Sequence, residues 1–280
     1  MTNSDQAKGA GIDDSIGKAR TYMAEELGNY YRADLVDAYL ESGPRALADL
    51  ENGTEIKFDL MTWSDYHPDK PGAIGMGRSL SIRAFDGRLL GADFERIRAP
   101  IKRIMVFGGM MLGLNEIADF RRPWGSFAAF ARVTRKIARF AADRLRHSRG
   151  TAVHGGNALV CRLFYTLRER GVPVWTDAPL TNLIVENGRV IGAELTHRGA
   201  LHRIRARRGV VLATGGFPCS GEMRQTFASK YPFDHTLAWS GNTGDGIRAA
   251  LTAGAKVDDE LASPALWTPA SVLTDTDGSA

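Results

Sequence analysis

Side chains that can exchange protons gather in the loop Ser64–Gly72, which carries Asp65, Tyr66, His67 and Asp69. A phenol, an imidazole and carboxylates are the groups that enzymes use for general acid–base chemistry. No partner for them is visible along the chain, and loop residues of these types are usually solvated. Two interpretations stay open, a substrate-facing Tyr66 or His67 and an ordinary surface loop. No metal site is predicted, because no second histidine or carboxylate stands at ligand spacing on a regular element.

A second feature is the run Ala213-Thr214-Gly215-Gly216, which contains no bulky side chain. It follows Val210–Leu212, an apolar run without alternation that is typical of a strand buried on both faces. Glycines allow positive φ and let the backbone come close to another object. In open α/β sheets, ligands bind at the carboxyl ends of such strands. The run therefore predicts either a ligand-binding turn or an ordinary turn after a core strand.

Two predicted helix starts could also meet a ligand. Gly156 and Asn157 lead into a helix over Ala158–Arg170, with Asn157 as a suitable cap. The free N–H groups of a helix start favour an anion, so structural capping and cofactor approach both remain open. Further along, Asp245 lies between two glycines before a helix over Ile247–Ala253. By itself that pattern indicates a tight polar turn at a helix start.

The elements around these residues follow a definite order. After the helix come a β segment at Val172–Trp175 and strands at Leu180–Glu186, Arg189–Leu195 and Leu201–Arg207. The first two strands are joined by an Asn-Gly pair, a strong hairpin signal. A helix, a β segment and a three-stranded meander thus lead into the strand that ends at Ala213.

The first 150 residues are mainly helical by periodicity. We expect a helix capped by Asp13 or Asp14, another over Ala33–Glu41 and a separate one starting at Pro44. A strand over Ile56–Trp63 and a short helix over Asn115–Phe120 follow. A long helix over Phe127–Arg146 carries an apolar stripe and many basic residues.

Composition limits the function classes. The chain has 280 residues, 44% apolar content and a net charge of +4, which predicts one large domain, possibly with part of a second. This charge fits a phosphate-bearing ligand as well as nucleic acid. The basic helix 127–146, with Arg203, Arg205 and Arg207 on one strand face, could form a nucleic-acid-binding module, but we favour a solvated basic face and predict no nucleic-acid partner.

Location and membrane contact are predicted from the same data. Cys161 and Cys219 are the only cysteines, which indicates a reducing compartment and a cytoplasmic protein. No signal peptide is visible after Met1. The longest nearly apolar run, Ile104–Leu114, spans 11 residues and is too short for stable membrane insertion.

Four motifs stand in the order seen in flavoproteins. They are Gly156-Asn157-Ala158-Leu159, Val190-Ile191-Gly192, Gly209 to Phe217 with its Ala-Thr-Gly-Gly turn, and Asn242-Thr243-Gly244-Asp245-Gly246-Ile247. Together they resemble the fumarate reductase/succinate dehydrogenase flavoprotein family. Asp65-Tyr66-His67-Pro68, Pro71-Gly72 and Gly77-Arg78 resemble a segment of its FAD-dependent 3-ketosteroid Δ1-dehydrogenase subgroup. The similarity runs from about Gly11 to Pro269.

The resemblance implies an α/β protein that binds FAD in a Rossmann-like domain and passes hydride between flavin N5 and a carbon–carbon bond next to a carbonyl. The resemblance implies that FAD contacts Gly156, Asn157, the backbone at Leu180, Ala213, Thr214, Gly215, Gly216 and Asp245. Tyr66 is the one residue it offers for catalysis, as a base or a helper. A steroid-like ketone or a dicarboxylate is the implied substrate, and the electron acceptor stays open. The positions that clamp a dicarboxylate in this family are not in the chain.

The resemblance also has departures. Members of the family begin with a strand and a G-x-G-x-x-G turn that holds the pyrophosphate, and neither is present here. The implied organisation is a partial FAD-binding domain at 1–257, with a mainly helical insertion at 1–150 and the helix, β-meander and Ala-Thr-Gly-Gly strand at 151–257. The start of a capping domain follows at 258–280. We expect an internal part of a flavoenzyme, and an inactive flavoprotein fragment remains the alternative.

Overall fold

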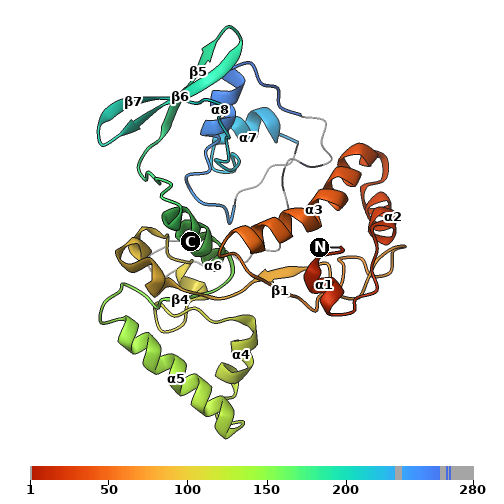
Figure 1. Ribbon diagram of the computed structural model, residues 1–280, viewed down its shortest axis with the longest axis vertical. Coiled ribbons are helices and arrows are strands. Elements are labelled where there is room, and N and C mark those ends of the chain that lie inside the picture. The colour runs from red at the N-terminus through yellow and green to blue at the C-terminus, as the bar shows by residue number, and fades with distance from the viewer. Residues whose placement is uncertain (1, 231–234, 259–262, 264, 266–280) are drawn as a thin grey trace. The chain divides into compact units, whose positions relative to one another are not determined.

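The chain forms two compact units in the computed structural model, which describes residues 2–230, 235–258, 263 and 265 (Figure 1). The first unit covers Met1–Pro173 and the second begins at Val174. Most of the predicted capping segment 258–280, including Leu266 to Pro269, lies outside the described residues.

The first unit is mainly helical, as its periodicity predicted. Its helices are α1 (Asp5–Gly9), α2 (Ile16–Leu27), α3 (Ala33–Gly53), α4 (Leu114–Arg121), α5 (Phe127–Asp143) and α6 (Gly155–Glu169). Its 3₁₀ helices are η1 (Gly28–Tyr30), η2 (Gly87–Arg96) and η3 (Lys102–Ile104). Four short strands form two antiparallel pairs, β1 (Phe58–Leu60) with β2 (Leu80–Ile82) and β3 (Phe85–Asp86) with β4 (Ala152–Val153).

The prediction of two helices around Pro44 was wrong, because α3 runs through this residue without a break. A proline removes only its own N–H donor, so the helical bonds before and after it can persist. Val36 and Leu40 of α3 pack with Ala19 of α2 in a small buried cluster, which fixes the first half of the helix. The strand predicted over 56–63 is shorter than expected and covers only Phe58–Leu60.

A buried arginine organises the amino-terminal part of this unit. Arg78 donates hydrogen bonds to Asp14 at 2.7 and 3.1 Å and to Asp65 at 2.7 Å, and all three side chains are at most 12% exposed. Burial opposes ionisation of Asp14, but hydrogen bonds from Arg78, Thr2 and the Ser15 N–H, with the charge of Arg78, together lower the pKa of this carboxyl. Neither Asp13 nor Asp14 caps α2 as predicted, because Ser15 accepts from the Lys18 N–H instead.

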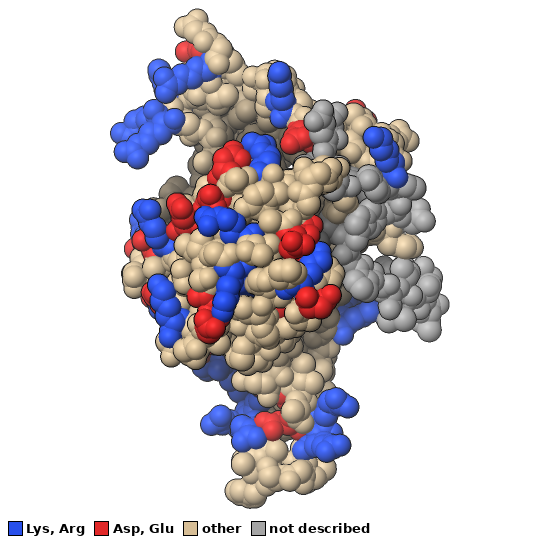
Figure 2. All heavy atoms as spheres, turned by 90° about the vertical axis from the view of Figure 1, so that its right-hand side faces the viewer, with Lys and Arg blue, Asp and Glu red and all other residues tan. Residues whose placement is uncertain are grey.

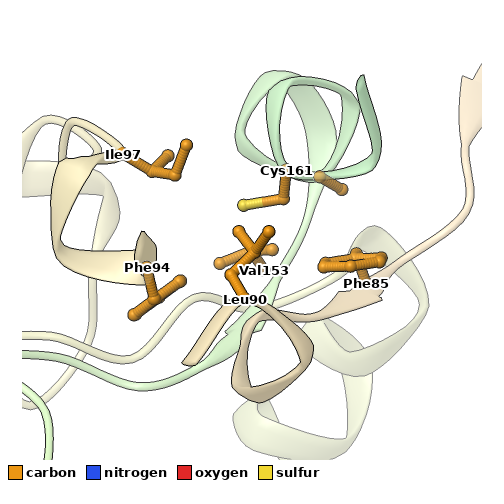
Figure 3. Close-up of a cluster of buried hydrophobic side chains, with 7 residues drawn as sticks. Phe85, Leu90, Phe94, Ile97, Val153 and Cys161 are labelled. Carbon is orange, nitrogen blue, oxygen red and sulfur yellow. The ribbon is translucent and has the colours of Figure 1, made fainter. Parts of the chain in front are cut away.

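The main core of the first unit is a cluster of apolar side chains between η2, β3, β4 and α6. Phe94, Leu90, Val153 and Cys161 are at most 1% exposed and point toward one another (Figure 3). Beside them, the Arg162 guanidinium donates to the backbone carbonyls of Glu55, Arg83 and Ala84 at 2.6 to 3.0 Å. One side chain of α6 therefore satisfies carbonyl groups that such short strands leave without partners.

Helices α4 and α5 form a hairpin in which much of the predicted apolar stripe stays outside the core. Val133 is buried, whereas Phe127, Phe130, Ile137 and Leu145 are exposed. The sequence predicted a surface helix with a solvated basic face, and most of its apolar stripe is exposed as well. The reason is that only the second half of α5 contacts the rest of the unit.

The second unit is built on the predicted meander. Strands β5 (Leu180–Glu186), β6 (Arg189–His197) and β7 (Ala200–Arg205) pair antiparallel in that order, and α7 (Gly221–Phe227) and α8 (Asp245–Thr252) follow. The Asn187-Gly188 pair has positive φ at both residues, as a type I′ turn requires. Helix α8 packs against β5. Helix α8 begins at Asp245, two residues before the predicted start at Ile247.

Two other predicted strands are not formed. Val172–Trp175 is irregular, and so is Val210–Leu212, where the Val211 side chain is 89% exposed. A strand exists only when its backbone pairs with another strand, and no strand among the described residues pairs with either segment. The expectation of a strand buried on both faces before Ala213 is therefore corrected.

We predict that Arg78→Met lowers the free energy of unfolding of the first unit by about 3–5 kcal/mol, because it leaves two buried carboxylates without a cation. The measurement is urea unfolding followed by circular dichroism at neutral pH. Asp14 has a lowered pKa, so its contribution is complete above its ordinary value of 3.8 and is lost as the pH falls through the lower folded value.

Arg83→Met is the matched control, since the Arg83–Asp59 pair is mostly exposed and pairs of that kind contribute at most about 1 kcal/mol. Equal losses of stability in the two variants would show that the Arg78 cluster has no special role.

Candidate functional site

The Ala213–Gly216 turn presents its backbone at the surface of the second unit. Ala213, Thr214 and Gly215 are exposed, and Gly216 is half-buried. Gly215 has φ +78°, a left-handed conformation that side chains other than that of glycine rarely adopt. The sequence predicted a positive φ in this pair, and one of the two glycines has it.

This turn lies against the start of α8. A Cβ atom at Gly246 would meet the Thr214 Oγ1 at 2.1 Å, and one at Gly215 would meet the Asn242 Oδ1 at 2.9 Å. Real Cβ atoms do not come closer than about 3.0 Å. Two of the motifs that resemble flavoproteins, separated by some thirty residues, therefore touch because neither glycine carries a side chain.

The Gly241–Gly244 segment is held by further contacts. The Cys219 N–H donates to the Asn242 carbonyl at 3.0 Å, and the Asn242 N–H donates to the Trp239 carbonyl at 2.8 Å. Gly244 has φ +82° and takes the N-cap position of α8. A Cβ atom there would meet the Met223 Sδ at 2.1 Å, so α7 also packs directly on this turn. Sequence reasoning missed the role of Met223 and Asn242, since nothing in their types predicts a partner so far along the chain.

Asp245 occupies the first turn of α8, where a carboxylate is favoured by the helix dipole. It accepts hydrogen bonds from the Thr243 hydroxyl at 3.0 Å and from Arg248 at 2.6 Å. Its side chain is still largely exposed, so part of the carboxylate can accept from a further donor. Leu180 begins β5, the strand that α8 packs against, and its side chain is half-buried.

Gly156 and Asn157 belong to the first unit. Helix α6 begins earlier than predicted, with His154 as N-cap residue and Gly155 at φ +53°. Asn157 is therefore not the cap, and its amide donates to the Arg98 carbonyl at 2.8 Å. The first turn has no side-chain cap, and Cβ positions at Gly155 and Gly156 would meet nothing within 4 Å. This helix start is open to an incoming group.

A charged cluster lies beside that helix start. The Glu116 carboxylate accepts from Lys136 and from the Gly113 N–H, and the His154 Nε2 lies 3.2 Å from the Lys136 Nζ. Burial, together with the charge of Lys136, lowers the pKa of His154. Burial opposes ionisation of Glu116, but bonds from Lys136 and Gly113 lower its pKa. No local pattern predicts this cluster, because its members come from α4, α5 and the N-cap position of α6.

Two of the four proton-exchanging side chains in the loop Ser64–Gly72 are held by contacts, His67 and Asp65. His67 contacts the Glu26 carboxylate at 2.6 Å, and Asp65 is held by Arg78. Tyr66 is 95% exposed, with its ring edge toward His67, and no hydrogen bond reaches its hydroxyl from the described residues. Asp69 is exposed. Of the four, Tyr66 and Asp69 have polar groups with no partner among the described residues, and only the Tyr66 side chain is a phenol.

The described residues contain neither a cluster of metal ligands nor a membrane-spanning helix. Among the described residues, no three His, Cys, Asp or Glu side chains gather where they could hold a metal ion. Within that part, none of the helices has both the length and the apolar character to span a bilayer.

A glycine turn packed against a polar helix start is the kind of site that binds dinucleotides. The chain belongs to the FAD binding domain family, which matches residues 1–280. FAD is the cofactor of that family, in agreement with the flavoprotein resemblance of the sequence.

The relatives are dehydrogenases. The chain is 32% identical to the 3-oxosteroid 1-dehydrogenase of Mycolicibacterium smegmatis, over 96% of its own length and 48% of that protein. It is 30% identical to the 4-oxocyclohex-2-ene-1-carboxylate 5-dehydrogenase of Sinomonas cyclohexanicum, over 96% and 46%. It thus spans about half the length of these relatives.

A solved structure agrees with them. The crystal structure of 3-ketosteroid Δ1-dehydrogenase from Sterolibacterium denitrificans, in complex with 1,4-androstadiene-3,17-dione, is matched with a TM-score of 0.78 and 30% identity. The match covers 91% of this chain and 46% of that one. The fold is therefore that of an FAD-binding protein similar to ketosteroid dehydrogenases, with helices and sheets both present.

The exposed backbone of Ala213–Gly215 and the nearby Asp245 carboxylate are suited to FAD. The Ala213–Gly215 backbone is exposed, and the first turn of α8 beside it begins with two glycines that flank a carboxylate. Small residues at the first motif leave room for a flat ligand, while the carboxylate suits a ribose hydroxyl. The open start of α6 could accept an anionic group.

We predict that Gly246→Ala destabilises the second unit by about 1–3 kcal/mol, because its methyl group would overlap Thr214. Removing the Thr214 hydroxyl and methyl in Gly246→Ala/Thr214→Ala should recover part of that loss. Thermal unfolding followed by tryptophan fluorescence measures both effects.

Gly221→Ala serves as the control, since a Cβ atom at Gly221 meets nothing within 4 Å and its φ is not positive. If Gly246→Ala were as stable as Gly221→Ala, the close contact between the two motifs would be refuted.

Proposed function

We propose that the chain supplies the FAD-binding part of a dehydrogenase that oxidises a carbon–carbon bond beside a ketone. The observation that carries this proposal is the family match over residues 1–280, with the two flavoprotein motifs in contact at Gly215 and Gly246. The substrates in the names of the two relatives, a 3-oxosteroid and 4-oxocyclohex-2-ene-1-carboxylate, both contain a ring ketone. We therefore favour a steroid-like cyclic ketone over a dicarboxylate as substrate.

The proposed organisation keeps the boundaries inferred from the sequence. Residues 1–257 form an incomplete Rossmann-like FAD-binding domain without the G-x-G-x-x-G unit, and 258–280 begin a capping domain. The exposed Val211 supports this proposal, since an apolar segment of this kind is suited to pairing in a larger sheet. The free cysteines Cys161 and Cys219 support a cytoplasmic location.

Most of the proposed FAD contacts belong to the second unit. Ala213, Thr214, Gly215 and Gly216 would lie along the dinucleotide, and Asp245 would accept from a ribose hydroxyl. Leu180 would offer its backbone to the adenine end of FAD. In the first unit, Gly156 and Asn157 stand at the start of α6, which would accept an anionic group. FAD, when bound, supplies the hydride acceptor at flavin N5.

Tyr66 is the proposed catalytic residue. Its free, exposed side chain could, as the phenolate, take a proton from the carbon beside the keto group and become the phenol, or assist the residue that does. His67 and Asp65 cannot share this role in the same way, because Glu26 and Arg78 already engage them. The electron acceptor has no support from either chain or relatives.

We predict that Ala213→Glu weakens FAD binding by at least about tenfold, because a carboxylate would point at a polyanionic ligand. The measurement is titration of the purified chain with FAD, followed by the flavin absorbance bands and fluorescence quenching. Ala200→Glu, at an exposed turn of the meander, introduces the same charge and should change binding by less than about twofold. Equal effects at the two positions would reject the placement of FAD at this turn.

We predict that Tyr66→Phe lowers kcat for a 3-ketosteroid by about a hundredfold or more and leaves the FAD content unchanged, because the phenol moves a proton. The assay uses the longest form of the protein that its gene encodes, with an artificial dye as electron acceptor. Tyr30→Phe, another exposed tyrosine of the first unit, is the control and should keep full activity. Full activity of Tyr66→Phe would remove this residue from the mechanism without touching the FAD proposal.

A further inference from the structure

The segment 101–150 differs sharply in charge from the rest of the chain. It contains eleven Lys and Arg against three Asp and Glu, a net charge of +8, whereas the other 230 residues carry a net charge of −4. Such asymmetry points to a polyanionic partner for the basic part. Neither the FAD site nor Tyr66 uses this segment.

The acidic side chains of the segment are all engaged within the first unit. Asp119 accepts from Arg132 at 2.6 and 2.8 Å, Glu116 accepts from Lys136, and the buried Asp143 accepts from Thr151. By contrast, Arg121, Arg122 and Arg135 are exposed and pair with no acidic group among the described residues. The excess positive charge is therefore presented to the solvent.

Large apolar side chains stand beside these arginines. We define the hairpin tip as residues 121–127, the turn between α4 and α5 with one residue of each helix. In it, Trp124 is 81% and Phe127 is 87% exposed. The Trp124 ring stacks on Phe130 at 5.0 Å, so the aromatic pair is already ordered. Leu114 and Ile117 on α4 are also exposed.

Among the described residues, the hairpin contacts the rest of the first unit away from its tip, and Lys136 lies 3.2 Å from His154. Arg139 contacts Asp86 at 2.8 Å, and Asp143 bonds both the N–H and the hydroxyl of Thr151 at 2.8 Å. The residues of the hairpin tip contact only other residues of α4, α5 and the turn between them, within the part of the chain that the structure describes. Figure 1 shows α4 and α5 side by side, and Figure 2 shows basic side chains around the end of the first unit where they lie, with a few acidic ones between.

We propose that the hairpin tip docks on the surface of an anionic lipid bilayer. Arginines attract anionic headgroups, while tryptophan and phenylalanine bury their rings at the boundary with the acyl chains. This mode of binding lies on the membrane and does not span it. Nucleic acid explains the arginines equally well, but it gives no role to exposed aliphatic side chains such as Leu114, which gain only from hydrocarbon.

The test is flotation of the 280-residue chain with vesicles of phosphatidylcholine mixed with phosphatidylglycerol, and with vesicles of phosphatidylcholine alone. We expect the chain to bind the anionic vesicles, to bind the neutral ones much more weakly, and to lose affinity as salt is added. Arg121→Gln/Arg122→Gln should weaken binding about thirtyfold, from about 1 kcal/mol for each charge. Trp124→Ala/Phe127→Ala should weaken it at least about tenfold.

Matched controls remove the same groups elsewhere in the first unit. Lys8→Gln/Arg45→Gln deletes two exposed positive charges, and Trp63→Ala deletes another exposed tryptophan. Both should bind as the parent chain does. All four variants change exposed side chains, and unchanged circular dichroism spectra would verify that they fold.

Several results would overturn the proposal. They are absence of binding to anionic vesicles, binding that the tip variants retain, and equal losses in the controls. Tighter binding of a single-stranded or duplex oligonucleotide than of vesicles would assign the surface to nucleic acid instead. Loss of vesicle binding in a longer form of the protein would mean that further chain covers the tip. None of these outcomes bears on FAD binding, which the Ala213 variant tests separately.

Discussion

The structure of the second unit depends on the absence of a side chain at two glycines. Gly246 lies directly over Thr214, and Gly215 lies directly over the Asn242 amide, with no room for a methyl group at either point. A methyl group at either position would force the facing side chain to shift, and at Gly215 the positive φ adds backbone strain. The contact brings an exposed backbone turn and a helix start with its carboxylate together. Every proposed FAD contact of this unit either belongs to that junction or lies on β5, which α8 packs against.

The first unit is held together in a different way. Its strands are two or three residues long, so the sheets satisfy little of the backbone. Buried guanidinium groups take over this task, as Arg162 does for three carbonyls and Arg149 does for the Ile97 carbonyl at 2.7 Å. Burial lowers the pKa of both groups, a sign of the cost of keeping a cation inside. Arg78 is the third of these centres, and it alone pairs with carboxylates.

The surface of the chain carries apolar groups in two distinct settings. Val211 is exposed in an irregular apolar segment that leads into small residues, a setting that suits pairing with another strand. Trp124 and Phe127 are exposed among unpaired arginines, a setting that suits a charged, partly apolar surface. Exposure alone does not distinguish these cases.

Local sequence determined the elements that depend on neighbouring residues. The Asn187-Gly188 hairpin, the three meander strands, the helix after Gly156 and the positive φ of Gly215 were all predictable, because turn chemistry and periodicity act within a few residues. The flavoprotein motifs also gave the family correctly. Where prediction failed, a distant contact decided the result. Asp14 accepts from Arg78 instead of capping α2, and Asn157 donates to the Arg98 carbonyl instead of capping α6. Val210–Leu212 pairs with no strand among the described residues. Only the tertiary structure could bring Thr214 to Gly246 or Lys136 to His154, because these pairs are 32 and 18 residues apart and no local rule fixes where a side chain meets another element.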